Sequence, residues 1–391
     1  MTSRARLWLA GLLPLLLLAG IGMLFLRFGP LGVFRAAFPP VEELTVQRIR
    51  LPEPGQLEVH VVNGGPEPVT VAQVLIDEAY WEYEIEPGPT VERLKSATIR
   101  AAYPWVEGEP HEVTIMTNTG LTFSAGVEVA TQSPAPSLRY LATFTLLGLY
   151  VGVIPVFLGL LWFPFLCRVE RKWVHFFLSL TVGLLLFLGI DALHEAIELQ
   201  ERVPEAFQGM GLVVLGVLGS VFGLVAVSRW LRGRDRRGDA SPPLCLAYMV
   251  ALGIGLHNLG EGLAIGAAYS VGAISLGAFL VIGFAIHNTT EGLGIVAPLA
   301  STRPALWQLI ALGALAGLPT IAGTWIGGFT YRPGLAVFSL ALGAGAIFQV
   351  VWELGRLIRR ESESGWSAPL NAMGLVAGLV IMYSTALLVV A

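Results

Sequence analysis

The chain has 391 residues, of which 54% are hydrophobic and only 13% are charged. Soluble domains carry about 25% charged residues, so this composition predicts that most of the chain lies in a membrane. The net charge of −4, with basic residues confined to short clusters between apolar runs, argues against a nucleic-acid partner. The sequence has no Gly-x-x-x-x-Gly-Lys-Ser/Thr loop, which argues against ATP-driven pumping by this chain alone.

Residues 1–29 form the first predicted unit, an N-terminal membrane anchor. The apolar run 7–28 follows Arg4 and Arg6. It exceeds the roughly 7–15 residues of a signal-peptide core, and no clear small-x-small cleavage site follows it. We therefore expect an uncleaved anchor, with a cleaved secretory signal as the alternative.

Residues 30–137 differ in character from the rest of the chain. Turn signals such as Asn63-Gly64 separate short runs of alternating polarity, which is typical of strands. Several short strands with turns between them predict a small antiparallel β-sandwich. We expect its His60 and His111 to be ordinary strand residues rather than metal ligands. The predicted strands cover residues 56–62, 69–76, 97–103, 112–117 and 122–130.

Residues 138–391 contain eight further apolar runs. A membrane-spanning helix needs roughly 20 mostly apolar residues, and each run reaches that length. Together with the anchor they make nine expected helices, and the fold class is a mainly α membrane protein. The eight runs cover residues 139–166, 173–198, 209–231, 243–268, 272–299, 304–329, 333–357 and 367–391.

Basic residues alternate between the connections, and this predicts the orientation. The connections 167–172, 232–242, 300–304 and 356–366 carry clusters of Arg and Lys or a single Arg. The opposite connections carry only Arg202 and Arg332. Because cytoplasmic loops are enriched in basic residues, we expect a cytoplasmic N-terminus and an extracytoplasmic β domain and C-terminus. The membrane would be the plasma membrane or a bacterial inner membrane.

One polar pattern occurs twice, in two adjacent apolar runs. HNLGEGLAI starts at His257 and HNTTEGLGI starts at His287. The His and Glu of each copy are one turn apart on one helix face, and ionisable residues inside a membrane are costly and usually functional. The loop between the runs is very short, so the two helices should be neighbours. The expected ligand atoms come from His257, Glu261, His287 and Glu291, with Asn258 and Asn288 at the edge of the site.

This mixture of nitrogen and carboxylate ligands favours zinc, iron(II), manganese or cobalt over calcium or copper(I). The alternative is that the polar residues join helices by hydrogen bonds. That role explains a single His or Asn well. It explains the repeated pattern poorly, because two buried carboxylates repel unless a proton or a cation lies between them.

Residues 138–391 resemble the ZIP family of divalent-metal transporters. HNLGEG at 257–262 and HNTTEG at 287–292 are similar to the motifs on the fourth and fifth helices of that family. The second and seventh helices are similar as well, through DALHEAIE, with Asp191 and Glu195, and AGAIFQVVWE, which ends at Glu353. The resemblance implies an eight-helix bundle that is not an enzyme and has no resident cofactor. It implies transport of a divalent metal ion toward the cytoplasm, with zinc as the expected ion and iron or manganese as alternatives.

The sequence departs from the family pattern at three positions. Gly260 and Thr290 occupy slots where relatives carry proline. Thr320 stands about where relatives with two adjacent metal positions carry a Glu on the sixth helix. We therefore expect one dominant metal position, and a weaker second one around Asn258, Asn288 and the shared glutamates.

Other polar residues suggest a pathway. Asp191, His194, Glu195 and Glu198 share one face at the end of the second run, either as an acidic entrance or as a solvated helix end. Gln349 and Glu353 either line an exit or are structural, with Glu353 paired to Arg356. Two other functions remain open: a membrane metal sensor, and an intramembrane metal-dependent hydrolase, although no HExxH motif is present. A homodimer is compatible with the sequence, and lipid is an expected partner.

Overall fold

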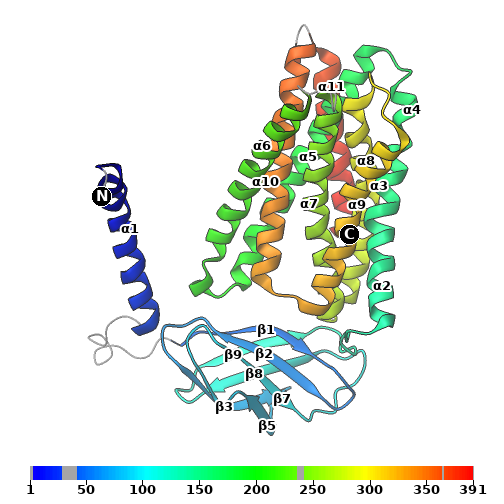
Figure 1. Cartoon of the computed structure of the whole chain (residues 1–391). Coiled ribbons are helices and arrows are strands. Elements are labelled where there is room, and N and C mark those ends of the chain that lie inside the picture. The colour runs from blue at the N-terminus through cyan, green and yellow to red at the C-terminus, as the bar shows by residue number, and fades with distance from the viewer. Residues whose placement is uncertain (1–2, 29–41, 236–241, 363–364, 391) are drawn as a thin grey trace.

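The computed structural model describes residues 3–28, 42–235, 242–362 and 365–390. It consists of a long helical bundle and a small antiparallel β domain at one end of the bundle, with a further helix, α1 (Ser3–Phe28), that stands apart from both in Figure 1. The predicted fold class, mainly helical with a small β domain, is confirmed. We call the end of the bundle next to the β domain the β-domain end, and the other the distal end.

The β domain contains two antiparallel sheets that share one hydrophobic core. All five predicted strands are present, as β2, β3, β7, β8 and β9, while β1 and the short β4, β5 and β6 were not predicted. The first sheet has the order β1 (Leu44–Arg50), β2 (Leu57–Asn63), β7 (Ser96–Ala101), β5 (Tyr83–Glu86). The second has the order β4 (Ala79–Tyr80), β3 (Val69–Ile76), β8 (His111–Thr117), β9 (Thr122–Val127), and β6 (Thr90–Val91) pairs with β3.

Eight segments of the described chain are long and apolar enough to cross a membrane, as predicted. The first span is interrupted by a π-helical segment, η1 (Leu149–Val153). In α1, the described apolar part is the shorter segment Leu12–Leu24, and the predicted anchor stays a prediction. The helices of the bundle are α2 (Leu138–Gly148), α3 (Ile154–Leu160), α4 (Phe163–Leu166), α5 (Arg171–Leu199), α6 (Gly209–Asp235), α7 (Pro242–Ser270), α8 (Ile274–Val296), α9 (Leu306–Thr330), α10 (Pro333–Glu361) and α11 (Pro369–Val390).

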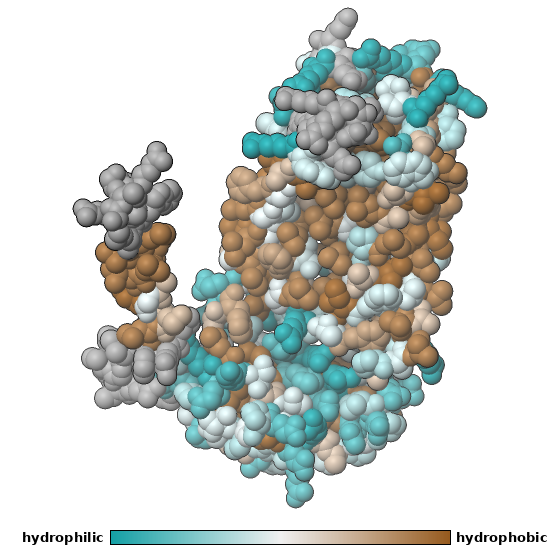
Figure 2. Space-filling model, in the orientation of Figure 1, coloured by the Kyte–Doolittle hydropathy of each residue, from teal (hydrophilic) through white to brown (hydrophobic). Residues whose placement is uncertain are grey.

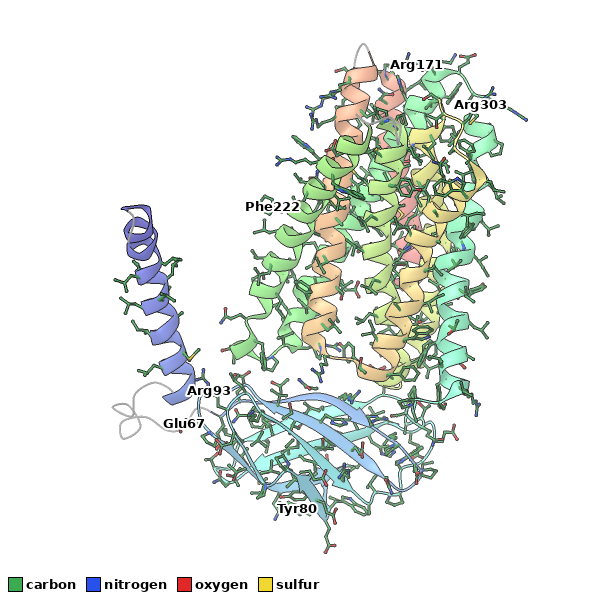
Figure 3. The ribbon with its side chains drawn as sticks, viewed as in Figure 1. Glu67, Tyr80, Arg93, Arg171, Phe222 and Arg303 are labelled. Atoms are coloured by element: carbon green, nitrogen blue, oxygen red, sulfur yellow. The ribbon has the colours of Figure 1, made fainter. Side chains whose placement is uncertain are left out.

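The surface of the bundle fits a membrane. Hydrophobic side chains cover it between hydrophilic groups at the two ends (Figure 2), and Phe222 points away from α6 (Figure 3). Arg171 and Arg303 lie at the distal end, far from the β domain (Figure 3). Two predicted basic residues of the 232–242 connection, Arg236 and Arg237, lie outside the described residues.

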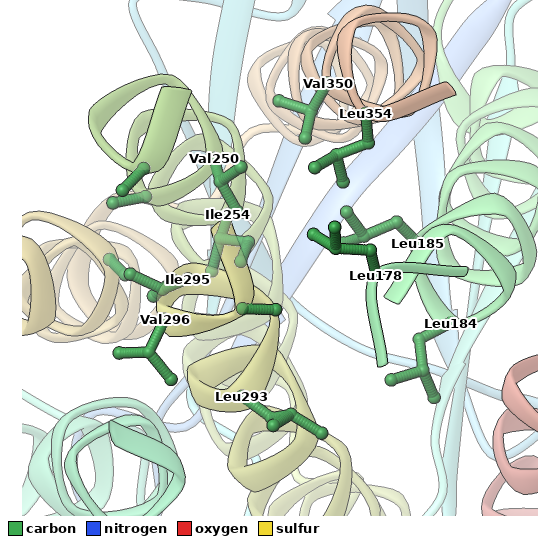
Figure 4. Packing of buried hydrophobic residues seen from close by; sticks show 14 of the residues in the cluster. Leu178, Leu184, Leu185, Val250, Ile254, Leu293, Ile295, Val296, Val350 and Leu354 are labelled. Atoms are coloured by element: carbon green, nitrogen blue, oxygen red, sulfur yellow. The ribbon is translucent and has the colours of Figure 1, made fainter. Parts of the chain in front are cut away.

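The distal half of the bundle is filled by apolar side chains. Leucines of α5 meet Val250 and Ile254 of α7, Ile295 of α8, and Val350 and Leu354 of α10 (Figure 4). All five of these residues are almost fully buried. Apolar packing therefore closes the centre of the bundle toward the distal end.

Glycines bring the site-bearing helices close to their neighbours. A Cβ at Gly262 of α7 would collide with the backbone of Thr320 on α9. A Cβ at Gly292 of α8 would collide with backbone atoms of Val156 and Gly159 on α3. These two glycines each follow the Glu of a motif copy, so close backbone approach fixes both glutamates against a second helix.

Candidate metal centre

The two motif copies meet in the middle of the bundle. All six motif residues are buried, with at most 8% of each exposed. Both helices run unbroken through their motifs, including Gly260 and Thr290. The Thr290 hydroxyl donates to the His287 carbonyl oxygen at 2.6 Å. The residues in the proline slots therefore leave both helices intact, and the motif faces keep the helical spacing that the sequence predicts.

Glu261 lies between the two imidazoles. Its Oε1 is 3.0 Å from Nε2 of His257, on its own helix, and 2.5 Å from Nε2 of His287 on α8. One carboxylate oxygen thus faces two ring nitrogens, each of which needs a proton or a cation to make a favourable contact. Three of the four expected ligands are therefore in direct contact across α7 and α8.

Glu291 completes the group from one turn further along α8. Single ligand atoms of His257, His287 and Glu291 all lie within 4.8 Å of one another. Both carboxylate oxygens of Glu291 are buried and find no hydrogen-bond partner in the described part of the chain. Asn258 lies beside Glu291, but its amide nitrogen donates to the Ala316 carbonyl oxygen at 3.1 Å. A buried carboxylate is costly unless a cation or proton compensates it.

Asn288 holds Glu261 in place. Its amide nitrogen donates to Glu261 Oε2 at 3.1 Å and to the Val151 carbonyl oxygen at 3.0 Å. Val151 belongs to the π-helical segment η1, and such segments are frequent at functional sites because they redirect backbone carbonyls. No pattern in the sequence predicted this contact between Asn288 and the first span. Asn288 therefore orients the shared carboxylate through its amide nitrogen, and the predicted place of its carbonyl oxygen at the edge of the site stays a prediction.

Further oxygens lie near the proposed second position. Within the described residues, Oδ1 of Asn258, Oδ1 of Asn288 and the hydroxyl of Thr320 are buried without a hydrogen-bond partner. Thr320 packs against Gly152 and Gly262, so it is next to the motif on α7. These oxygens are neutral, and the weaker second metal position stays a prediction.

The predicted pathway residues fall into two groups. Asp191 is exposed and lies within electrostatic range of His257 and His287. Glu195, one turn further along α5, lines a cavity of about 840 Å³ between the helix ends and the β domain. Gln349 is buried in α10, and Glu353 is half-buried and makes an interaction of its own. Glu195 thus borders a cavity, while the entrance role of the α5 residues and the exit role of the α10 pair stay predictions.

The two histidines of the β domain lie in strands, as expected. His111 Nδ1 is 2.8 Å from the carboxylate of Asp77. His60 Nδ1 is 3.1 Å from the Thr98 hydroxyl. Burial, and then the positive charge of Arg48, lower the pKa of His60 from 6.5 to about 4, so this histidine is neutral at pH 7.

No family model matches the sequence, and no curated protein matches it.

Proposed function

We propose that the chain is a ZIP-type transporter that carries a divalent transition-metal ion across the membrane. We infer the transport step from the resemblance of residues 138–391 to that family. The proposed ligands are His257, Glu261, His287 and Glu291. The substrate would be zinc, with iron(II) or manganese as alternatives.

The observation that carries this proposal is the convergence of the two motif copies. Two imidazoles and two carboxylates meet inside an apolar bundle, with Glu261 Oε1 3.0 Å and 2.5 Å from the two ring nitrogens. If the polar residues only joined helices by hydrogen bonds, Glu291 would have hydrogen-bond partners. In the described chain, neither of its carboxylate oxygens makes a hydrogen bond of ordinary geometry. A divalent cation would satisfy both carboxylates at once, because it replaces the protons and cancels their repulsion.

The ligand set suits a borderline metal ion. Two imidazole nitrogens and two carboxylate oxygens are a donor set that zinc accepts in tetrahedral geometry. Calcium prefers six to eight oxygens, and copper(I) prefers sulfur. Cys167 lies between α4 and α5, and Cys245 lies in the first turn of α7, about three turns before His257, so neither cysteine belongs to the group of candidate ligands.

The surroundings favour access from the β-domain end. The cavity of about 840 Å³ lies on that side, whereas apolar packing fills the distal half (Figure 4). The basic residues Arg171 and Arg303 lie at the distal end, which supports a cytoplasmic distal end by the positive-inside rule. Metal would therefore enter from the extracytoplasmic side, where we also place the β domain and the C-terminus, and leave toward the cytoplasm.

Transport needs the site to face each side in turn. The membrane potential supplies about 2.3 kcal/mol per charge per 100 mV, and a divalent ion gains twice that on moving inward. Uptake of protons by the histidine and glutamate ligands would weaken metal binding and promote release. The chain's own contribution is to replace the water shell of the ion with four fixed side chains.

Metal flux into proteoliposomes tests this proposal. The full chain should accumulate zinc, and Glu261→Ala should reduce uptake at least about tenfold, because an interaction of a buried carboxylate with a cation is worth more than 1.4 kcal/mol. Cadmium, iron(II) and manganese, measured in parallel, would rank the substrates. Near-normal uptake by Glu261→Ala would exclude this site as the transport site.

The same assay separates the two other functions. A membrane metal sensor would bind zinc with the same residues and show no flux in the wild type. An intramembrane hydrolase would need an open coordination position and a general base, and it too would show no flux. The near-identity of the two motif copies favours a shared ligand role over a division into ligands and base.

A further inference from the structure

The β domain covers a cavity at the ends of the helices. The cavity has a volume of about 840 Å³. Its roof is formed by β1, over residues 44–49, and by β9 with the residue after it, over residues 123–128. Its floor and walls come from the last turns of α5 and α7 and the first turns of α8 and α10. Hydrophilic side chains gather where the β domain meets these helix ends (Figure 2).

The cavity leads toward the metal centre. Its lining includes Gly260, which directly precedes the shared ligand Glu261 on α7. Its lining also includes Glu195, which interacts electrostatically with Asp191 and Glu261. Asp191 in turn interacts with both site histidines. Acidic side chains therefore lie within electrostatic range of the ligands, and one of them, Glu195, lines the cavity.

Three separate contacts fasten the roof to the bundle. Arg48 of β1 donates a long hydrogen bond of 3.5 Å to the Phe329 carbonyl oxygen at the end of α9. Glu43 accepts a hydrogen bond of 3.1 Å from the amide of Glu205, between α5 and α6. The carbonyl oxygen of Val129 packs against the loop between α7 and α8. The β domain is thus held to helices on several sides of the cavity.

The size of the cavity suits a hydrated ion. Six waters at about 30 Å³ each occupy about 180 Å³, which is well below the 840 Å³ of the cavity. The cavity can therefore hold a divalent ion together with its first water shell.

Charged residues of both signs line the cavity. Its acidic lining residues are Glu128 of the β domain and Glu195 and Glu198 of α5. Its basic lining residues are Arg48 and Arg202. Arg48 cannot lose its charge at physiological pH, and it belongs to the roof, under which an ion must pass. A fixed positive charge at that place opposes cations and favours anions.

We propose that the β domain roofs the chamber through which a hydrated divalent cation reaches the metal centre, and that Arg48 limits cation access to it. This inference rests on the proposed function for the identity of the ion. The existence of the chamber and the effect of Arg48 on charged molecules do not depend on transport.

Cysteine modification in lipid nanodiscs, where both membrane faces are open to reagent, tests the proposal. Cys167 and Cys245 are first replaced by serine. Ala264, which lines the cavity one turn beyond Gly260 and is half-exposed, is then replaced in Ala264→Cys. Cationic trimethylammonium-ethyl and anionic sulfonatoethyl methanethiosulfonates are compared by their modification rates. The reactive control is Ala79→Cys, on an exposed strand of the β domain outside the cavity lining.

Both reagents should modify Ala264→Cys, and Arg48→Gln should raise the ratio of cationic to anionic rates by about three- to tenfold. Arg48→Lys, which keeps the charge, should restore the original ratio. The matched control Arg100→Gln removes an arginine of β7 that is paired with Glu58 and Glu86, and it should leave the ratio unchanged.

Two results would overturn the proposal: protection of Ala264→Cys from both reagents while Ala79→Cys reacts, or a ratio that Arg48→Gln does not change. Failure of the proposed function looks different. A wild-type chain without metal flux but with this charge-dependent modification would refute transport and retain the chamber.

Discussion

Replacing Glu291 should make the metal-free protein more stable while it destroys metal binding. Both oxygens of this carboxylate are buried without a hydrogen-bond partner in the chain as described. Replacement of buried ionic groups by apolar residues of similar volume often stabilises proteins, by about 1–4 kcal/mol. For a large chain, about 2 °C in Tm corresponds to each kcal/mol, so Glu291→Met should raise the Tm in EDTA by about 2–8 °C.

Zinc should stabilise the wild type far more than it stabilises Glu291→Met. At a zinc concentration about 100 times Kd, binding stabilises the wild type by about 2.7 kcal/mol. If loss of one ligand weakens binding about 100-fold, the same zinc stabilises Glu291→Met by only about 0.4 kcal/mol. The zinc-induced rise in Tm should therefore almost disappear in the variant.

Differential scanning fluorimetry of the purified full chain, with EDTA and with zinc, measures both effects. The matched control is Glu353→Met, which removes a half-buried carboxylate that has an interaction of its own. This control should not raise the Tm in EDTA and should keep the zinc shift. A lower Tm of Glu291→Met in EDTA, or an undiminished zinc shift, would refute the reasoning from the buried carboxylate.

Three further predictions follow from the contacts around the site and in the β domain. Asn288→Ala should weaken zinc binding about 10- to 100-fold in calorimetry, because the Asn288 amide orients the shared carboxylate. Asn258→Ala should weaken it less, because the Asn258 amide nitrogen donates to the Ala316 backbone carbonyl. Gly262→Ala should lower Tm by several degrees through a collision with α9, whereas Gly219→Ala, with open space around its Cβ position, should not; equal melting of the two would contradict the packing. Burial and a neighbouring arginine lower the pKa of His60 from 6.5 to about 4 in the folded protein. As the pH falls from 6.5 to about 4, His60 therefore gains a proton more readily in the unfolded chain, and the β domain should lose stability over this range. Allowing for partial solvation, the loss is about 1–2 kcal/mol. It should be visible as reduced hydrogen-exchange protection of β2, after correction for the intrinsic exchange rate. His60→Gln should remove this pH dependence.

The sequence alone allowed the centre of the site to be predicted, because helical geometry is regular. A spacing of four residues puts His257 and Glu261 on one face, and a short loop makes α7 and α8 neighbours. The structure brings these residues together with His287 and Glu291, as those two rules require. The five strands β2, β3, β7, β8 and β9 were predicted for a similar reason, since alternation of polarity with clear turn signals is a local property.

Features that depend on contacts between distant segments were not predictable. The bond from Asn288 to Val151 joins positions 137 residues apart and depends on a π-helical segment in the first span. The role of Arg48 depends on where the β domain rests on the bundle, and no pattern in the sequence relates β1 to the end of α9. Strand β1 was missed because polar residues, Gln47 and Arg48, interrupt its alternation where it lines the cavity.

The central claim is that both motif copies bind one metal ion, and zinc K-edge X-ray absorption of the zinc-loaded full chain tests it most directly. We expect four nitrogen and oxygen neighbours at about 2.0–2.2 Å, with the multiple scattering of two imidazoles, and a single imidazole in His287→Ala. Sulfur scattering at about 2.3 Å, or an unchanged number of imidazoles in His287→Ala, would contradict the claim.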